Sequence, residues 1–294
     1  MKIKVSKQRH IFNACNIAIM LLLSVIMIYP MWYVLCASFS ESSRLVAHEG
    51  MLLAPDGAST AAYEAVFKNP MIVKGYINTL IVVVSGVLLN IVITSIAAYC
   101  LSQQNVMWSK LIMKFIIITM YFSGGLIPTY LLVSRYLHLN NSFLALILPT
   151  AISTYNLIIM RTSFSQLPVS LIESAKLDGA THMQVLYKIV IPLSKSIIAV
   201  ITLYYAVGHW NSWFPASIYI KERQKFPLQL ILREILIQND TYSMSQDMAS
   251  ADQYAIGENI KYAIIVVATI PILCIYPFLQ RYFTKGVMIG AVKG

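Results

Sequence analysis

The chain has 294 residues, of which 58% are hydrophobic and only 12% charged, and its mean hydropathy is +0.68. These values exclude an ordinary soluble globular protein and indicate an all-α membrane protein that crosses the bilayer several times. The formal net charge of +10 fits either nucleic-acid binding or a membrane topology, and the positions of the charges decide between the two.

Six stretches are long and apolar enough to cross a membrane, since a spanning helix needs roughly 20 mainly apolar residues. We expect helices and not barrel strands, because the runs are long and uniformly apolar and an unpaired backbone group is costly in hydrocarbon. The stretches are about residues 13–37, 76–101, 111–134, 142–161, 195–219 and 260–282.

The first stretch also resembles a signal peptide, because four basic residues precede it. Its apolar run continues to Phe39, however, and no small-x-small cleavage site closes it. We therefore expect it to remain as the first helix, so that residues 13–283 form one six-helix transmembrane domain.

The basic residues gather on one side of the predicted membrane. With the N-terminus (1–12) in the cytoplasm, the loop 162–194 and the tail 284–294 also lie there. The segments 1–12, 102–114, 161–195 and 281–294 carry a net charge of +11, and the rest of the chain carries −1. This is the positive-inside pattern, so we attribute the high net charge to topology and expect no nucleic-acid partner.

The outer side holds two long segments, about residues 40–75 and 220–259. We expect helices at 59–68 and Leu228–Ile237, and the loop 220–259 is long enough to contact a partner protein. An outer net charge of −1 gives no sign of a basic funnel for an anionic solute.

The predicted spans lack the groups of an ion-coupled transporter. No acidic residue lies in their apolar interior, and His209 is the only imidazole there. The chain has no GxxxxGK[ST] motif to cradle ATP phosphates, and its five histidines and four cysteines form no catalytic or metal-binding pattern. We therefore expect a non-enzymatic subunit powered by a partner. A secondary transporter or channel that works without ATP, and a membrane enzyme, are the alternatives.

A polar island, Glu173 to Pro192, interrupts the apolar second half of the chain. We expect two short amphipathic helices hinged at Gly179, the second running from Thr181 to Val190 and ending at Pro192. In the first, Leu171, Ile172, Ala175 and Leu177 form the apolar face, and Glu173, Lys176 and Asp178 face water. Two hinged helices would suit a groove in another protein.

This island resembles the cytoplasmic EAA loop of the permeases of binding-protein-dependent ABC importers. The motif reads Glu173-Ser174-Ala175-Lys176-Leu177-Asp178-Gly179-Ala180, with Ile191-Pro192 at the matching distance. Ser174 in place of the first alanine, and Leu186 where an aromatic residue is common, are small departures.

Two further segments resemble the carbohydrate-type, MalG-like permeases. They are Trp210-Asn211-x-x-Phe214 and the tail from Lys285-Gly286-Val287 to Ala291-Val292-Lys293-Gly294. Within the family the chain is most similar to the LplC/YtcP-like branch, whose members serve importers of complex oligosaccharides, including uronate-rich ones. The second permease subunit of an alginate importer is the member that the resemblance suggests.

The resemblance implies the type I importer (MetI-like) fold in the bacterial cytoplasmic membrane. It implies a homologous second permease subunit, two ATP-binding cassette ATPase subunits and an extracytoplasmic solute-binding protein that delivers an oligosaccharide. The island, including Pro192, would be the coupling segment that docks on an ATPase. No cofactor is implied in this chain, because ATP and Mg²⁺ bind to the ATPase subunits.

Residues of the substrate path are harder to predict. Aromatic and hydrogen-bonding side chains hold sugars, but Trp and Tyr also form interface belts and small residues mediate helix packing, and His209 could equally be a packed imidazole. The candidates are Tyr121, Gly124, Gly125, Tyr155, Asn156, Tyr204, Tyr205, His209, Trp210, Asn211 and Trp213.

Overall fold

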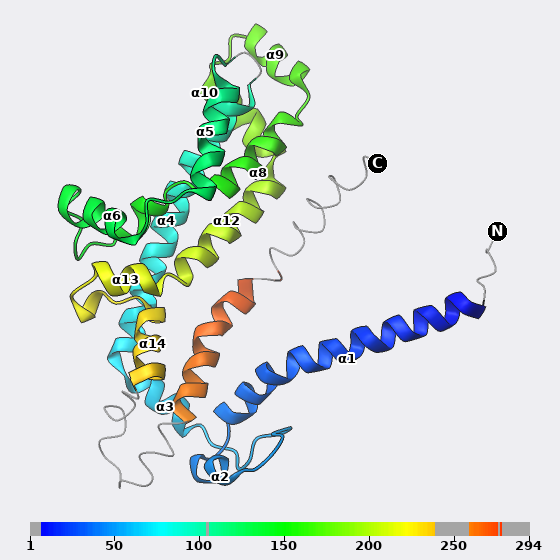
Figure 1. The fold of residues 1–294 in the computed structure, drawn as a ribbon, viewed down its shortest axis with the longest axis vertical. Helices are drawn as coiled ribbons and strands as arrows, with labels where there is room; N and C mark the ends of the chain where they lie inside the picture. The colour runs from blue at the N-terminus through cyan, green and yellow to red at the C-terminus, as the bar shows by residue number, and fades with distance from the viewer. Residues whose placement is uncertain (1–6, 104–105, 239–258, 276, 278–294) are drawn as a thin grey trace. The chain divides into compact units, whose positions relative to one another are not determined.

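The computed structural model describes residues 7–103, 106–238, 259–275 and 277 (Figure 1). The regular elements of these residues are all helical, and Ser40 and Ala58 form a single isolated β-bridge. The chain divides into two compact units, residues 1–70 with 234–269 and residues 71–233 with 270–294.

The first unit contains α1 (Lys7–Ser38), α2 (Ser42–Ala47), α3 (Ala61–Lys68) and most of the apolar helix Asn259–Ile275. The apolar side chains of α1 are exposed along almost its whole length, and only its last turn, Cys36–Ser38, is buried. That turn packs with Leu45 and Leu52 in a small core. A long helix with apolar side chains on all sides is typical of a membrane span.

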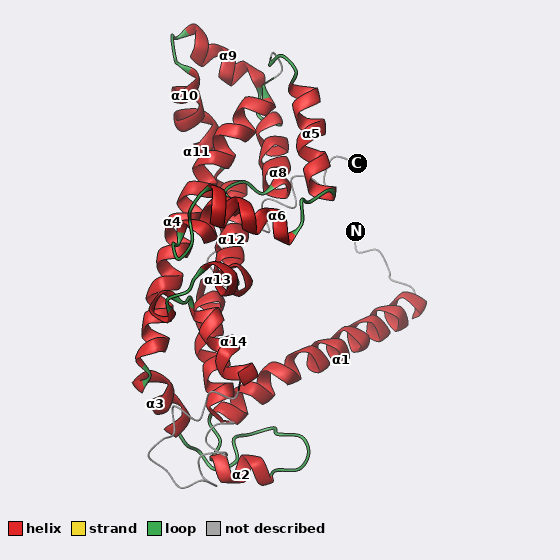
Figure 2. Ribbon diagram, turned by 60° about the vertical axis from the view of Figure 1, so that its left-hand side comes forward, coloured by secondary structure: helices red, strands yellow, loops and turns green. Residues whose placement is uncertain are grey.

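The second unit is built along α4 (Pro70–Ser102), a continuous 33-residue helix. In Figures 1 and 2, α9 and α10 lie at one end of this unit together with α5 and α8, and α14 lies beside α4 towards its other end. The remaining helices are α5 (Ser109–Tyr121), α6 (Leu126–Leu131), α7 (Leu144–Ile147), α8 (Thr154–Ser165), α9 (Val169–Leu177), α10 (His182–Val185), α11 (Ile191–Leu193), α12 (Lys195–Trp210), α13 (Trp213–Tyr219) and α14 (Leu228–Gln238), whose last residues belong to the first unit.

Short irregular turns join several of these helices. π-Helical turns follow α6 (Leu132–Tyr136) and α10 (Leu186–Val190), and 3₁₀ turns lie at Leu148–Thr150 and Arg223–Lys225. π-Helical turns are rare and often occur at functional sites.

Two of the predicted spans are single helices, Lys7–Ser38 and Pro70–Ser102. The predicted spans 111–134, 142–161 and 195–219 are helical but interrupted. The third span bends by 109° between Tyr121 and Leu126, the fourth bends by 52° between Thr150 and Thr154, and α12 ends at Trp210. The last predicted span, 260–282, is described as a helix only as far as Ile275.

Glycine and proline explain two of the breaks. Gly125 precedes α6 with a φ of +87°, which side chains other than glycine rarely adopt. Pro149 lies in the 3₁₀ turn before the break in the fourth span. The helices predicted at 59–68 and Leu228–Ile237 on the outer side are confirmed as α3 and α14.

Candidate functional site: a coupling segment and a polar cavity

The polar island folds as two helices joined by a tight turn. α9 ends in a Schellman motif, in which the N–H of Gly179 donates to the carbonyl of Lys176 (3.0 Å) and the N–H of Ala180 donates to that of Ala175 (2.9 Å). Gly179 has a φ of +82°, and a Cβ there would meet nothing within 4 Å. The turn therefore needs glycine for its backbone conformation and not for close packing.

The second helix begins with a capping box. The Thr181 hydroxyl accepts from the N–H of Gln184 (3.3 Å), and the Gln184 side chain accepts from the N–H of Thr181 (2.8 Å). This helical segment, which continues through the π turn, ends at Leu193, one residue after Pro192, where it was predicted to end. An 88° bend at Ser194 then leads into α12.

The inner face of the segment belongs to the core of the second unit. Ile172, Val185, Leu186 and Val190 are buried, and they pack in one cluster with residues of α4, α8 and α12 such as Tyr99, Met160 and Ile201. Ala175 and Ala180 pack against this cluster. The inner face of the segment is therefore packed against α4, α8 and α12.

The outer face is open. Glu173, Ser174, Lys176, Leu177 and Asp178 are exposed, and the side chains of Glu173, Lys176 and Asp178 make no hydrogen bond or ion pair with the described residues. Pro192 is exposed as well.

The predicted apolar face of α9 is partly wrong, because Leu177 is 88% exposed and Leu171 44% exposed. At 100° per residue Leu177 lies 140° from Ile172, well outside the buried stripe. The hydrophobic side chain at the tip of the segment therefore faces solvent beside Asp178.

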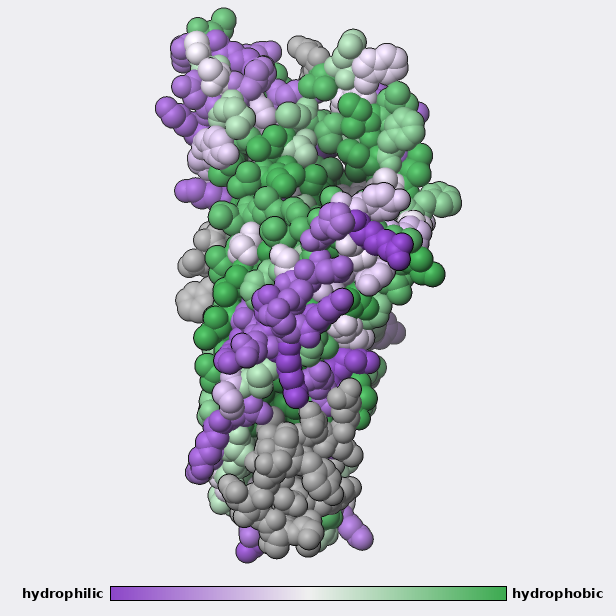
Figure 3. Space-filling model, turned by 90° about the vertical axis from the view of Figure 1, so that its left-hand side faces the viewer, coloured by the Kyte–Doolittle hydropathy of each residue, from purple (hydrophilic) through white to green (hydrophobic). Residues whose placement is uncertain are grey.

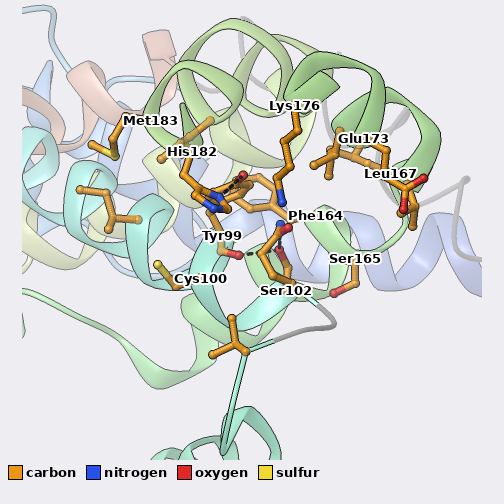
Figure 4. A pocket seen from close by; sticks show the side chains of 16 residues that line it. Tyr99, Cys100, Ser102, Phe164, Ser165, Leu167, Glu173, Lys176, His182 and Met183 are labelled. Carbon is orange, nitrogen blue, oxygen red and sulfur yellow. Dashed lines mark hydrogen bonds between the residues drawn. The ribbon is translucent and has the colours of Figure 1, made fainter. Parts of the chain in front are cut away.

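A cavity of about 670 Å³ lies beside the segment, lined by the ends of α4 and α8 and by α9 and α10. Figure 4 shows Glu173, Lys176 and His182 around it. The Tyr99 hydroxyl and His182 Nδ1 are 3.4 Å apart, and the two rings meet edge to face. The contact fixes α10 against the end of α4.

A second cavity of about 380 Å³ brings together four of the predicted path residues, Asn156, Tyr204, Tyr205 and His209. Backbone and side chains at the break before α8, among them Thr150 and Ser153, also line it. The cavity therefore combines aromatic rings with hydrogen-bonding groups, a composition typical of small-molecule sites.

Hydrogen bonds hold the break before α8 in place. Asn90 of α4 donates to the carbonyls of Thr150 (2.6 Å) and Ala151 (3.0 Å). The Tyr205 hydroxyl accepts from the N–H of Ser153 (2.9 Å) and lies 2.8 Å from the hydroxyl of Thr94. These contacts satisfy backbone groups that a helix would otherwise pair.

His209 is a structural side chain as well as a cavity residue. It is 5% exposed, and its Nε2 lies 2.8 Å from Asn90 Oδ1. A Cβ at Gly86 would approach the His209 ring to 2.5 Å, so only glycine leaves room for it. The reading of His209 as a packed, hydrogen-bonded imidazole is confirmed.

The other predicted path residues do not line this cavity. Tyr121 is 76% exposed at the end of α5, near Gly124 and Gly125. Tyr155 is 52% exposed, with its ring 6.3 Å from that of Tyr204. Trp210 is buried against Tyr76, Asn211 is exposed after α12, and Arg233 lies 4.4 Å from the ring centre of Trp213.

Asn90, Thr94 and Gly86 were not among the residues predicted from the sequence. Their signal was present, since an asparagine within an apolar span commonly hydrogen-bonds to a neighbouring helix. Among the described residues no three His, Cys, Asp or Glu side chains cluster as metal ligands would. The absence of a cofactor and of a catalytic site in this chain stays a prediction.

The helical fold and the segment Glu173–Ala180 fit a membrane permease component, and the comparison with known families shows this class. Residues 90–289 match the family described as "Binding-protein-dependent transport system inner membrane component", and the chain belongs to this family. The resemblance inferred from the segment Glu173–Ala180 is thereby confirmed.

Individual relatives span the whole chain. It is 40% identical to Protein LplC of Bacillus subtilis (strain 168), covering 98% of this chain and 97% of that protein. It is 38% identical to the polygalacturonan/rhamnogalacturonan transport system permease protein YtcP of the same organism, covering 98% and 100%. A chain in the crystal structure of a bacterial ABC transporter involved in the import of the acidic polysaccharide alginate matches with a TM-score of 0.86 and 28% identity, covering 96% of this chain and all of that one.

Proposed function

We propose that the chain is the permease subunit of an ABC importer that moves acidic, uronate-containing oligosaccharides across the cytoplasmic membrane. Relatives over its full length carry names that refer to polygalacturonan, rhamnogalacturonan and alginate. Its partners are a second permease, two ATPase subunits that bind ATP and Mg²⁺, and a solute-binding protein. Both termini and the segment Glu173–Ala180 lie in the cytoplasm, as the charge distribution favours.

The observation that carries the proposal is the two-faced coupling segment. Its outer face presents Glu173, Leu177 and Asp178 without partners among the described residues, and its inner face is part of the core that contains α4, α8 and α12. An ATPase subunit that binds the outer face would move this segment when the ATPase dimer closes. The helices packed against the inner face would then move as well. The cavity beside Tyr205 and His209 would then change its access.

The test is the ATPase activity of the reconstituted importer with and without its loaded binding protein. Gly179→Pro removes the N–H bonded to Lys176 and forbids a φ of +82°. We expect the stimulated rate to fall to the basal rate, with the complex still assembled in the membrane.

Gly179→Asn is the matched control, because asparagine tolerates the left-handed conformation better than other side chains. It should keep most of the stimulation, and Asp178→Lys should lose it by reversing a charge on the outer face. Full stimulation in Gly179→Pro would refute the coupling role.

A further inference from the structure

The outer segments of the second unit carry a marked excess of positive charge. Residues 71–75, 135–141 and 220–233 hold six Lys or Arg and one acid, Glu222, a net charge of +5. The outer acids lie elsewhere in the sequence, at 41–64 and at 234–258. The total of −1 therefore hides a separation of charges between different outer segments.

Hydrogen bonds bring these segments together. Asn141, with a φ of +59°, uses its side-chain oxygen to accept from the N–H groups of Lys221 (3.3 Å) and Glu222 (3.2 Å), and its side-chain amide donates to Glu222 Oε1 (2.5 Å). Asn78 of α4 donates to the carbonyls of Gln224 (2.8 Å) and Phe226 (3.1 Å). One surface thus includes the start of α4, the loop after α6 and the turn after α13.

We call this surface the basic stripe and define it as Lys74, Arg135, Lys221, Arg223 and Lys225. Lys74 lies one turn before Asn78 on α4, and Arg135 follows Ser134, whose carbonyl accepts from Asn140 (3.3 Å). Figure 3 shows a diagonal band of hydrophilic residues on one face of the molecule.

The one acid beside the stripe, Glu222, is paired with a stripe residue. Glu222 lies 3.0 Å from the Lys225 ammonium. Hydrogen bonds from Lys225 and from Asn141 lower the pKa of its carboxyl group, so it remains ionised in that pair. Lys74, Arg135 and Lys221, in contrast, are exposed, and their side chains make no hydrogen bond or ion pair with the described residues.

The stripe lies far from the coupling segment. Lys74 and Ser102 are near opposite ends of α4, so they are about 40 Å apart at 1.5 Å per residue. If the coupling segment is cytoplasmic, the stripe faces the other side of the membrane. A cluster of cations there runs against the positive-inside pattern, and topology does not explain it.

We propose that the basic stripe docks an acidic face of the solute-binding protein. This inference rests on the proposed function. The stripe is an exposed surface that lines none of the cavities described above, which fits a broad protein face better than a single sugar. Complementary charge would speed the encounter and orient the partner on the permease.

The test uses the complete importer in nanodiscs and measures ATPase stimulation against the concentration of its loaded binding protein at low and high salt. In the triple variant Lys74→Gln/Arg135→Gln/Lys221→Gln we expect the half-maximal concentration to rise at least about fivefold at low salt, with an unchanged maximal rate. The difference from wild type should shrink at high salt, where exposed charges are screened.

The matched control is Lys7→Gln/Lys110→Gln/Lys114→Gln, which removes the same charge from exposed positions of the predicted cytoplasmic side. It should behave as wild type. An unchanged half-maximal concentration in the stripe variant would overturn the inference.

Direct binding decides whether the stripe contacts the sugar instead. If the stripe variant loses binding of trigalacturonate but still docks the unloaded binding protein normally, the stripe is a sugar site and the inference is wrong. If the wild-type importer shows no stimulation at all, the proposed function has failed, and this outcome is distinct from either result.

Discussion

At the scale of single residues, two glycines of the second unit make opposite demands. Gly86 faces the His209 ring, and a Cβ there would lie 2.5 Å from Nε2. Gly208, one residue before His209 on α12, would place its Cβ in open space. Replacing each glycine by alanine therefore distinguishes two effects. At Gly86 the added Cβ has no space, and at Gly208 only the low helix propensity of glycine is at stake.

We expect Gly86→Ala to destabilise the protein by about 1–3 kcal/mol, because overpacking displaces His209 from Asn90. Gly208→Ala should be neutral or stabilise by up to about 1 kcal/mol, because alanine favours helix. The thermal unfolding midpoint of the detergent-solubilised protein measures both. Equal midpoints for the two variants would show that the imidazole is not confined as described.

In the coupling segment, the residue pattern predicted the turn correctly but not the burial of every side chain. The turn at Gly179 followed from the known freedom of glycine, and the structure has it there with a φ of +82°. The burial of Leu177 was predicted wrongly, because composition suggested an apolar face whose angular limits only helical geometry sets. The roles of these residues in coupling stay predictions.

At the scale of elements, the broken fourth span depends on a few hydrogen bonds. The Tyr205 hydroxyl links the N–H of Ser153 to Thr94 of α4. Together with Asn90, it holds the start of α8 without a continuous helix before it.

Tyr205→Phe should leave the N–H of Ser153 unsatisfied and destabilise the protein by about 1–3 kcal/mol. Hydrogen exchange at residues 151–156 should become faster, and exchange in α9 should not change. Tyr136→Phe is the control, because Tyr136 is 78% exposed. Unchanged exchange at 151–156 in Tyr205→Phe would contradict the assigned bonds.

Element by element, the sequence predicted where the apolar segments lie but not whether each is one helix. Hydropathy is averaged over a window of residues, so it does not detect a break in a helix. The backbone groups left unpaired at such a break can bond to polar side chains of another helix. The break at Thr150–Thr154 depends on Asn90, 60 residues earlier. Only a structure that brings these segments together reveals that dependence.

At the scale of the whole molecule, charge counting favoured one topology but did not show how the outer charges are divided among segments. A single sum of −1 for the outer side averaged the +5 of one set of segments with the acids of the others. The charge that a partner meets is the local charge of a surface patch and not the sum over one side of the membrane. The sequence does not show this patch, because hydrogen bonds of Asn78 and Asn141 bring together segments that are distant along the chain.

The central claim is that the segment Glu173–Ala180 contacts an ATPase subunit, and cross-linking tests it most directly. Leu177 is 88% exposed at the tip of the segment, so Leu177→Cys, in a chain whose four native cysteines are changed to serine, offers a reactive thiol. With a short cross-linker that carries one maleimide and one amine-reactive ester, we expect a covalent product between this thiol and a lysine of the ATPase subunit, and none from Tyr136→Cys. Failure of Leu177→Cys to cross-link in an assembled, active importer would contradict the account.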